Sequence, residues 1–327
     1  MNKSLKILIF RFGAIGDVVL STSLFRSIKN IYPDSEIHFL TFKTPAILLK
    51  EDPQIKKLWI AEDRSYKYLI SLAKELKKEN FDIVFNLHPS IRTKIFTLFI
   101  KAKRTLLYKK TFKKHAVQNF VDTAKPLLKK IKPESTIKIY LSETAINEAN
   151  KHINKEKLNV CLNIGATFSR QGRRWSIDKW KQLSLELIKE YDCDIILSGS
   201  EEDIPFADEV CSVSERIKSF CGKLPLEISA AVISLCNLMV SGDTGPLHIA
   251  TATDTKSIAL FGSMSPKRTG PYGTKHFSLT SKIKCAPCNK RKCKFIKKTE
   301  LNTPCMESIT VEEVLNTIKA NNLLIKT

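Results

Sequence analysis

The sequence predicts an α/β protein of two domains, each a parallel β-sheet covered by helices on both faces. Short, continuous apolar runs, such as KILIF at 6–10, are typical of strands that are buried on both faces. These runs alternate with segments of about ten to fifteen residues that have helical spacing, which indicates a doubly wound parallel sheet. A polar helical segment at 140–157 interrupts the alternation, which then begins again.

The first series of elements starts at the N-terminus. The run at 6–10 is the first expected strand, and the glycine-containing turn RFGAIGD follows it at 11–17. Helical spacing over 17–30 predicts the first helix, which Pro33 ends. The remaining expected elements are strands at 36–41, 57–60 and 82–86, a short helix at 44–50 and an amphipathic helix at 66–79.

The second series follows the polar segment. We expect strands at 159–164, 194–197, 217–220, 238–240 and 257–261, and helices at 176–191, 204–212, 226–236 and 310–321. The predicted domains are therefore 1–154 and 155–327, the second with a cysteine-rich loop at 285–305 and a closing helix at 310–321. A ligand cleft is expected between two such sheets.

Composition excludes several classes of protein. No apolar run approaches the roughly 18 residues of a membrane span, and the apolar run near the N-terminus is too short for a signal peptide. Nine cysteines in 327 residues do not form the pattern of a secreted disulfide framework. We therefore expect a cytoplasmic protein.

Positive charge is concentrated in the first half of the chain. Residues 1–150 contain 28 Lys and Arg against 14 Asp and Glu, whereas residues 151–327 contain 26 against 19. Seven basic residues lie between Lys101 and Lys114. Such a cluster suits nucleic acid, anionic lipid headgroups or a phosphorylated substrate, although lysines also cover ordinary solvated faces.

The turn after the first strand places a carboxylate at a helix N-terminus. Gly13-x-x-Gly16-Asp17 lacks the G-x-G-x-x-G fingerprint of dinucleotide-binding proteins, which argues against an oxidoreductase. Asp17 is either an N-cap or a general base for a substrate hydroxyl.

Two turns of the second series suit an anionic ligand. The loop NIGATFSRQGRRW at 163–175 carries Arg173 and Arg174, which either neutralise a diphosphate or are simply exposed. In SGDTGPLH at 241–248, Gly245 and Pro246 start a helix whose free N–H groups favour an anion. The alternative for this second turn is an ordinary tight turn that Asp243 or Thr244 caps.

Together these motifs resemble glycosyltransferase family 9, the ADP-heptose:lipopolysaccharide heptosyltransferases. RFGAIGDVVLSTSLFRSIK is similar to the family's R-x-G-x-x-G-D motif, NIGATFSRQGRRW to its nucleotide-phosphate loop, and SGDTGPLHIATA to its D-T-G-P-x-H-x-A-x-A signature. The resemblance implies a GT-B fold of two Rossmann-like domains. The N-terminal domain would bind the acceptor, and the C-terminal domain would bind the sugar nucleotide.

The resemblance also implies an inverting transfer of heptose from ADP-heptose to Kdo or heptose of the lipopolysaccharide inner core, without a catalytic metal. Asp17 would be the base. The expected sugar-nucleotide site comprises Thr167, Arg173, Arg174, Asp243, Thr244, Gly245 and His248. The expected acceptor site comprises Arg11, Gly13, Gly16, Lys101, Lys103 and Arg104. We expect a monomer that acts on a lipid A–Kdo acceptor at the inner face of the inner membrane.

Four of the cysteines form a separate cluster in the second domain. They are Cys285, Cys288, Cys293 and Cys305, and they begin with a C-x-x-C pair. Four thiols at this spacing could hold a structural zinc, or they could be plain reduced thiols. No cofactor is expected to take part in catalysis.

Two other functions stay open at this point. One is a different enzyme of the same fold, either a transferase of another sugar or a sugar-nucleotide epimerase, which would need no basic, membrane-facing domain. The other is a nucleic-acid-binding protein. It is disfavoured because the basic run contains only Tyr108 and Phe112 as aromatic residues for stacking on bases.

Overall fold

The computed structural model describes residues 4–127, 136–165, 171–297 and 302–325. The chain divides into two compact units, Met1–Tyr140 (unit 1) and Leu141–Thr327 (unit 2). The division lies before the expected one at 154/155, because helix α6 (Glu143–Asn150) packs against α9 (Leu226–Leu235) of unit 2. Ser142, the N-cap of α6, donates a 2.7 Å hydrogen bond to Oε1 of Glu227.

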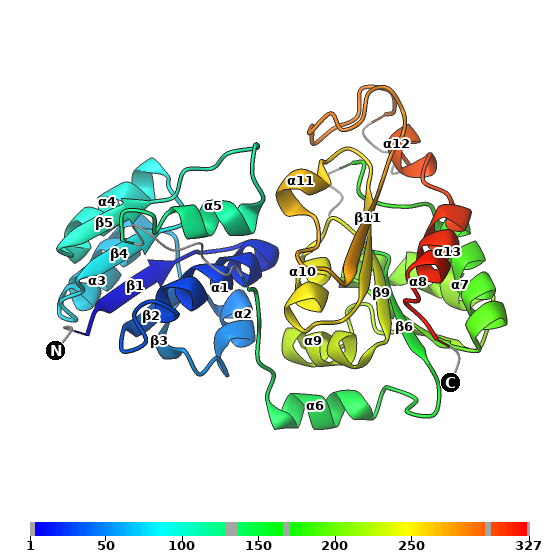
Figure 1. Cartoon of the computed structure of the whole chain (residues 1–327), viewed down its shortest axis with the longest axis horizontal. Coiled ribbons are helices and arrows are strands. Elements are labelled where there is room, and N and C mark those ends of the chain that lie inside the picture. Colours follow the sequence, from blue (N-terminus) through cyan, green and yellow to red (C-terminus); the bar gives the residue numbers. More distant parts are fainter. Residues whose placement is uncertain (1–3, 128–135, 166–170, 298–301, 326–327) are drawn as a thin grey trace. The chain divides into compact units, whose positions relative to one another are not determined.

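Unit 1 contains a five-stranded parallel sheet in the order β3-β2-β1-β4-β5 (Figure 1). The strands are β1 (Lys6–Phe10), β2 (Glu36–Phe42), β3 (Ile55–Ala61), β4 (Ile83–Asn86) and β5 (Arg104–Leu107). The helices are α1 (Ile15–Lys29), α2 (Lys43–Ala46), α3 (Tyr66–Lys77), α4 (Ile91–Ile100) and α5 (Ala116–Asp122), with a 3₁₀ turn η1 (Ile47–Leu49). Strand β5 and helices α4 and α5 were not predicted from the sequence.

Helices cover both faces of this sheet, as expected for a doubly wound fold. Helices α3 and α4 pack Leu72 and Phe96 into one core with Leu40 of β2. The neighbouring residue Phe39 packs edge-on against Phe25 of α1, with ring centroids 6.2 Å apart. Because successive side chains of a strand point to opposite faces, α1 covers the other face.

Unit 2 contains a six-stranded parallel sheet in the order β11-β10-β9-β6-β7-β8. The strands are β6 (Asn159–Asn163), β7 (Asp194–Ser198), β8 (Ile217–Ser219), β9 (Leu238–Gly242), β10 (Ser257–Phe261) and β11 (His276–Thr280). The remaining helices are α7 (Ile177–Tyr191), α8 (Ile204–Cys211), α10 (Gly245–Ala252), α11 (Pro266–Thr269), α12 (Pro304–Glu307) and α13 (Val311–Ala320), with a 3₁₀ turn η2 (Glu201–Asp203). The doubly wound prediction is confirmed in both units, although the edge strand β11 was not predicted.

The strand orders determine which turns come together. In unit 1 the order reverses between β1 and β4, and in unit 2 it reverses between β6 and β9. Ligands of open α/β sheets bind at the carboxyl ends of strands beside such a reversal. The turn 11–17 therefore lies next to the turn after β4, and the arginine loop after β6 lies next to the turn after β9.

Two shielded histidines make stability depend on pH. Burial lowers the pKa of His38 and that of His276 from 6.5 to about 4. Nε1 of Trp59 donates a 3.1 Å hydrogen bond to Nδ1 of His38, which only a neutral imidazole nitrogen can accept. Between these pH values the unfolded chain binds protons that the folded chain does not bind. We therefore expect the free energy of unfolding to fall as the pH is lowered from 6.5 to 4, with His38 contributing on the order of 2 kcal/mol.

Urea unfolding at a series of pH values measures this dependence. The variant His38→Gln should show a shallower fall in stability over the same range, because one of the buried histidines that titrate there is gone. An unchanged pH profile in this variant would contradict the assignment.

Candidate functional site

In unit 1, Asp17 lies in the first turn of α1 rather than at its cap. The helix begins at Ile15, and its N-cap is Ala14, which makes no side-chain capping bond. Oδ2 of Asp17 instead accepts a 2.5 Å hydrogen bond from Nη2 of Arg11, and the Asp17 side chain is 28% exposed. The carboxylate is therefore accessible and oriented by a cation, which suits a base better than a capping residue.

Arg11 connects the two turns that meet at the strand reversal. Its Nη1 donates a 2.5 Å hydrogen bond to the carbonyl oxygen of Leu87, directly after β4. Of the other expected acceptor residues, Gly16 is buried within α1, and Gly13 has a φ of +153°, which disfavours a side chain.

His88 joins this group, although sequence reasoning did not select it. Its ring centroid lies 6.0 Å from that of Phe12. Burial, and next the positive charge of Arg11, lowers the pKa of His88, while Asp17 opposes this effect. The signal that could have found His88 was its position after a strand that pairs with β1.

The structure does not bring the expected acceptor cations Lys101, Lys103 and Arg104 to Asp17. Arg104 begins β5 and pairs in register with Ile83, the first residue of β4. Lys103 forms a 2.6 Å ion pair with Asp82, just before β4. These residues therefore lie at the amino end of the strands, whereas Asp17 follows the carboxyl end of β1.

In unit 2, Arg173 is held by the turn after β9. Its guanidinium donates a 2.5 Å hydrogen bond from Nη1 to the carbonyl oxygen of Asp243, and Nη2 lies 2.7 Å from Oδ2 of the same residue. A Cβ atom on Gly242 would lie 2.4 Å from the carbonyl oxygen of Arg173, so only glycine permits this close approach. Asp243 thus positions Arg173 in this structure.

The start of α10 lies beside this ion pair. The side chain of its N-cap residue, Thr244, accepts no hydrogen bond from the first backbone N–H groups of the helix. The Thr244 hydroxyl instead accepts a 2.9 Å hydrogen bond from Nδ2 of Asn163, at the end of β6. Gly245 starts the helix, and His248 is buried in its first turn. A cation and a helix N-terminus therefore adjoin, which favours an anion.

Arg174 faces away from this group and into the core of unit 2. It forms a 2.6 Å ion pair with Asp203, and their side chains are 8% and 3% exposed. Its guanidinium also lies over the ring of Phe206, 4.7 Å from the centroid. The geometry favours a structural role for Arg174, in place of the expected contact with the nucleotide. Thr167 lies outside the described residues.

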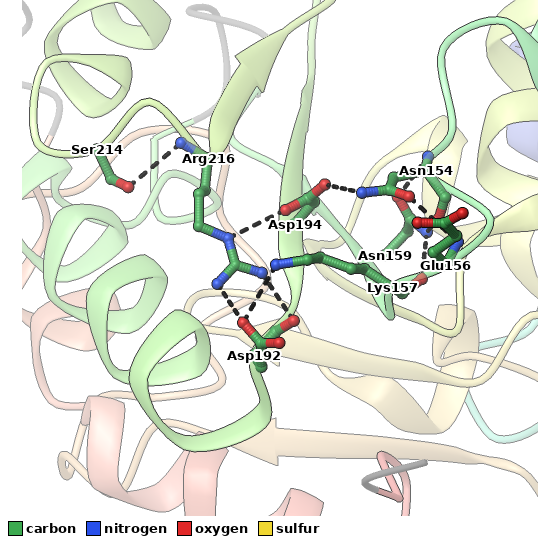
Figure 2. A network of polar contacts seen from close by, with 8 residues as sticks. All are labelled: Asn154, Glu156, Lys157, Asn159, Asp192, Asp194, Ser214 and Arg216. Atoms are coloured by element: carbon green, nitrogen blue, oxygen red, sulfur yellow. Dashed lines mark hydrogen bonds and ion pairs between the residues drawn. The ribbon is translucent and has the colours of Figure 1, made fainter.

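We expect Arg174→Met to destabilise unit 2 by about 3 kcal/mol, because it leaves the buried Asp203 carboxylate without its cation. The matched control is Arg216→Met. Arg216 bridges Asp192 and Asp194 at 2.5 and 3.1 Å in a network at the surface of unit 2 (Figure 2). Its side chain is 27% exposed and that of Asp192 is 74% exposed, so its loss should cost less than about 1 kcal/mol. If denaturant unfolding showed the same loss of stability in both variants, the structural role of Arg174 would be contradicted.

The cysteine-rich loop supports the arginine loop. The buried Gln171 accepts a 2.9 Å hydrogen bond from the backbone nitrogen of Cys293, and its amide nitrogen donates to the carbonyl oxygen of Lys297 at 3.0 Å. Its backbone nitrogen donates to the carbonyl oxygen of Arg291, also at 3.0 Å. The loop that carries Arg173 is therefore anchored two residues away by a segment from the far end of the chain.

The four clustered cysteines line one pocket together with Gln171 and Gly172. Cys285 and Cys288 are exposed, whereas Cys305 is buried. Within the described ranges, no three His, Cys, Asp or Glu side chains are placed so that they could hold a metal ion.

The sequence is similar to one family of glycosyltransferases and to individual heptosyltransferases. Residues 69–299 match the family described as glycosyltransferase family 9 (heptosyltransferase). The lipopolysaccharide core heptosyltransferase OpsX of Haemophilus influenzae is 27% identical over 289 residues, which are 81% of each chain. A lipooligosaccharide heptosyltransferase 2 of Campylobacter jejuni is 24% identical over 316 residues, 93% of this chain and 95% of that one.

Solved structures show the same fold. A glycosyl transferase of family 9 from Veillonella parvula has a TM-score of 0.83 at 21% identity and covers 99% of this chain and 98% of its own. The ADP-heptose lipopolysaccharide heptosyltransferase II of E. coli has a TM-score of 0.80 at 20% identity, with 98% of both chains covered. The predicted GT-B class, two Rossmann-like domains, is thereby confirmed.

Proposed function

The chain belongs to glycosyltransferase family 9, and from this premise we propose that it transfers heptose from ADP-heptose to the inner core of lipopolysaccharide. The family and the heptosyltransferases similar to it make the enzyme a glycosyltransferase. The observation that carries the donor assignment is the pairing of Arg173 with Asp243 beside the uncapped start of α10. This arrangement offers guanidinium and backbone N–H donors to a diphosphate.

The proposed chemistry is an inverting displacement. An acceptor hydroxyl attacks the anomeric carbon of heptose while the carboxylate of Asp17 takes the hydroxyl proton. The bond between that carbon and the diphosphate oxygen breaks, and ADP leaves with the bonding electrons. Arg173 and the N–H groups of Thr244 and Gly245 stabilise the negative charge that develops on the diphosphate. Arg11 keeps the Asp17 carboxylate oriented, and His88 lies at the same end of the sheet.

The proposed setting follows from the acceptor. A lipid A–Kdo acceptor would be met at the cytoplasmic face of the inner membrane, by a monomeric enzyme that binds this surface without crossing it. Among the described residues, no helix is long and apolar enough to cross a membrane.

Calorimetric titration with ADP, UDP and GDP, with and without EDTA, tests the donor assignment. We expect ADP to bind at least about tenfold more tightly than the other two nucleotides, equally well with EDTA, because the proposed site uses side-chain and backbone donors instead of a metal. A preference for UDP would contradict the assignment and indicate another sugar or an epimerase. The metal content of the purified protein separately tests whether the four thiols bind zinc.

A further inference from the structure

The outer face of α4 is apolar, although it faces solvent. Ile91 is 78% exposed and Leu98 is 73% exposed, and Phe99 is 41% exposed. At 3.6 residues per turn, Leu98, Ile91, Ile95 and Phe99 occupy successive positions within an arc of about 100°. The opposite side of the helix is occupied by Phe96 and Ile100, which are buried in the core of unit 1. A helix that is apolar on both sides is normally buried, so this outer face calls for a partner.

Positive charge borders this apolar stripe on both sides. Lys94 precedes Leu98 around the helix, and Arg92 follows Phe99. The guanidinium of Arg92 lies over the ring of Tyr66, 4.8 Å from the centroid, and Tyr66 is itself 49% exposed at the start of α3. We call Tyr66, Ile91, Arg92, Lys94, Ile95, Leu98 and Phe99 the docking face; α3 and α4 can be followed in Figure 1.

The segment of the chain that contains α4 carries no acidic residue, although Asp63, outside that segment, interacts electrostatically with Arg92. Residues 83–121 include no Asp or Glu but nine Lys and Arg, among them the cluster between Lys101 and Lys114. Beyond the docking face, Phe112 is 61% exposed, with Nζ of Lys110 5.0 Å from its ring centroid. Cations and aromatic rings around an apolar stripe match the headgroup and upper acyl regions of an anionic bilayer. A second copy of this face would meet like charge, and nucleic acid offers no apolar layer for the stripe.

We propose that the docking face holds unit 1 against an anionic lipid bilayer, with Ile91, Leu98 and Phe99 inserted at the level of the headgroups. The cations then contact lipid phosphates while the helix lies parallel to the surface. This inference deepens the proposed function, because an enzyme attached in this way meets a lipid-linked acceptor on the surface where that acceptor resides.

Co-sedimentation with vesicles tests the proposal. The full-length protein should bind vesicles of phosphatidylcholine mixed with phosphatidylglycerol more tightly than vesicles of phosphatidylcholine alone, and high salt should weaken this binding. The variant Lys94→Gln/Leu98→Ser should bind at least about tenfold more weakly, because it removes one cation and one inserted side chain.

The chain provides a matched control on α7 of unit 2. Leu185→Ser/Lys189→Gln makes the same two changes four residues apart, at an exposed leucine and an exposed lysine. It should bind vesicles as the unchanged protein does. If both double variants lost vesicle affinity equally, the docking face would be overturned, because the overall positive charge of the protein and not this surface would then determine binding.

Measuring ADP binding on the same samples separates the two proposals. If the unchanged protein binds ADP but does not bind the vesicles, the docking face is overturned and the proposed function stands. Vesicle binding without ADP binding would overturn the proposed function alone. Tighter binding to duplex DNA than to vesicles at the same salt, or lipid-independent dimerisation that Leu98→Ser abolishes, would assign the surface to another partner and overturn the docking face.

Discussion

Replacing Asp17 with asparagine is expected to lower kcat by about a thousandfold, the usual order of effect when a general base is lost. An amide cannot take the proton of the acceptor hydroxyl, but it keeps the size and position of the carboxylate. The affinity for ADP should stay unchanged, because the proposed nucleotide contacts all belong to unit 2. Calorimetry and initial rates with an inner-core acceptor measure the two effects separately.

A second aspartate provides the control for this experiment. Asp178 also lies in the first turn of a helix, α7, where it is exposed. Asp178→Asn should therefore keep nearly full activity. If Asp17→Asn retained most of its turnover, Asp17 would not be the base, and His88 would become the next candidate at the same end of the sheet.

Replacing Arg173 with alanine is expected to weaken ADP binding by roughly 10- to 100-fold, the value of a charge-assisted contact to phosphate. The Asp243 side chain is only 5% exposed, so it also loses the cation that compensates its buried charge. The variant should therefore be less stable as well, by about 3 kcal/mol.

A double variant separates the loss of binding from the loss of stability. In Arg173→Ala/Asp243→Asn the buried charge is removed together with its partner, so much of the stability should return while ADP binding stays weak. Arg173→Lys should keep part of the affinity, because the charge remains but the two-point contact with Asp243 does not. If the double variant bound ADP as tightly as the unchanged protein, Arg173 would have no direct role at the diphosphate.

The sequence by itself determined the fold class and the turns that carry the site. Apolar runs, helical spacing, and the glycines and proline at the start of α10 are local signals, so the alternation of strands and helices could be predicted without knowing which strands pair. Elements without such signals were missed. The edge strand β5 is largely exposed, and its sequence has neither a continuous apolar run nor an alternation of apolar and polar residues. Helix α4 is apolar on its outer face too and so lacks the usual amphipathic pattern.

Only the tertiary structure decided which polar groups meet. Arg173 and Arg174 are adjacent in one loop, and nothing in the loop's sequence distinguishes them. In the structure, Arg173 pairs with Asp243 at the proposed anion site, whereas Arg174 pairs with Asp203 in the core. Likewise, Asp17 pairs with Arg11, whereas the cations near β5 lie at the other end of the strands. The physical reason is that Asp243 and Asp203 follow other strands than the one before the arginine loop, so strand order, not sequence spacing, brings each of them to its arginine. The pair of Arg11 and Asp17 is local to one turn, and strand order decides only what lies beside it.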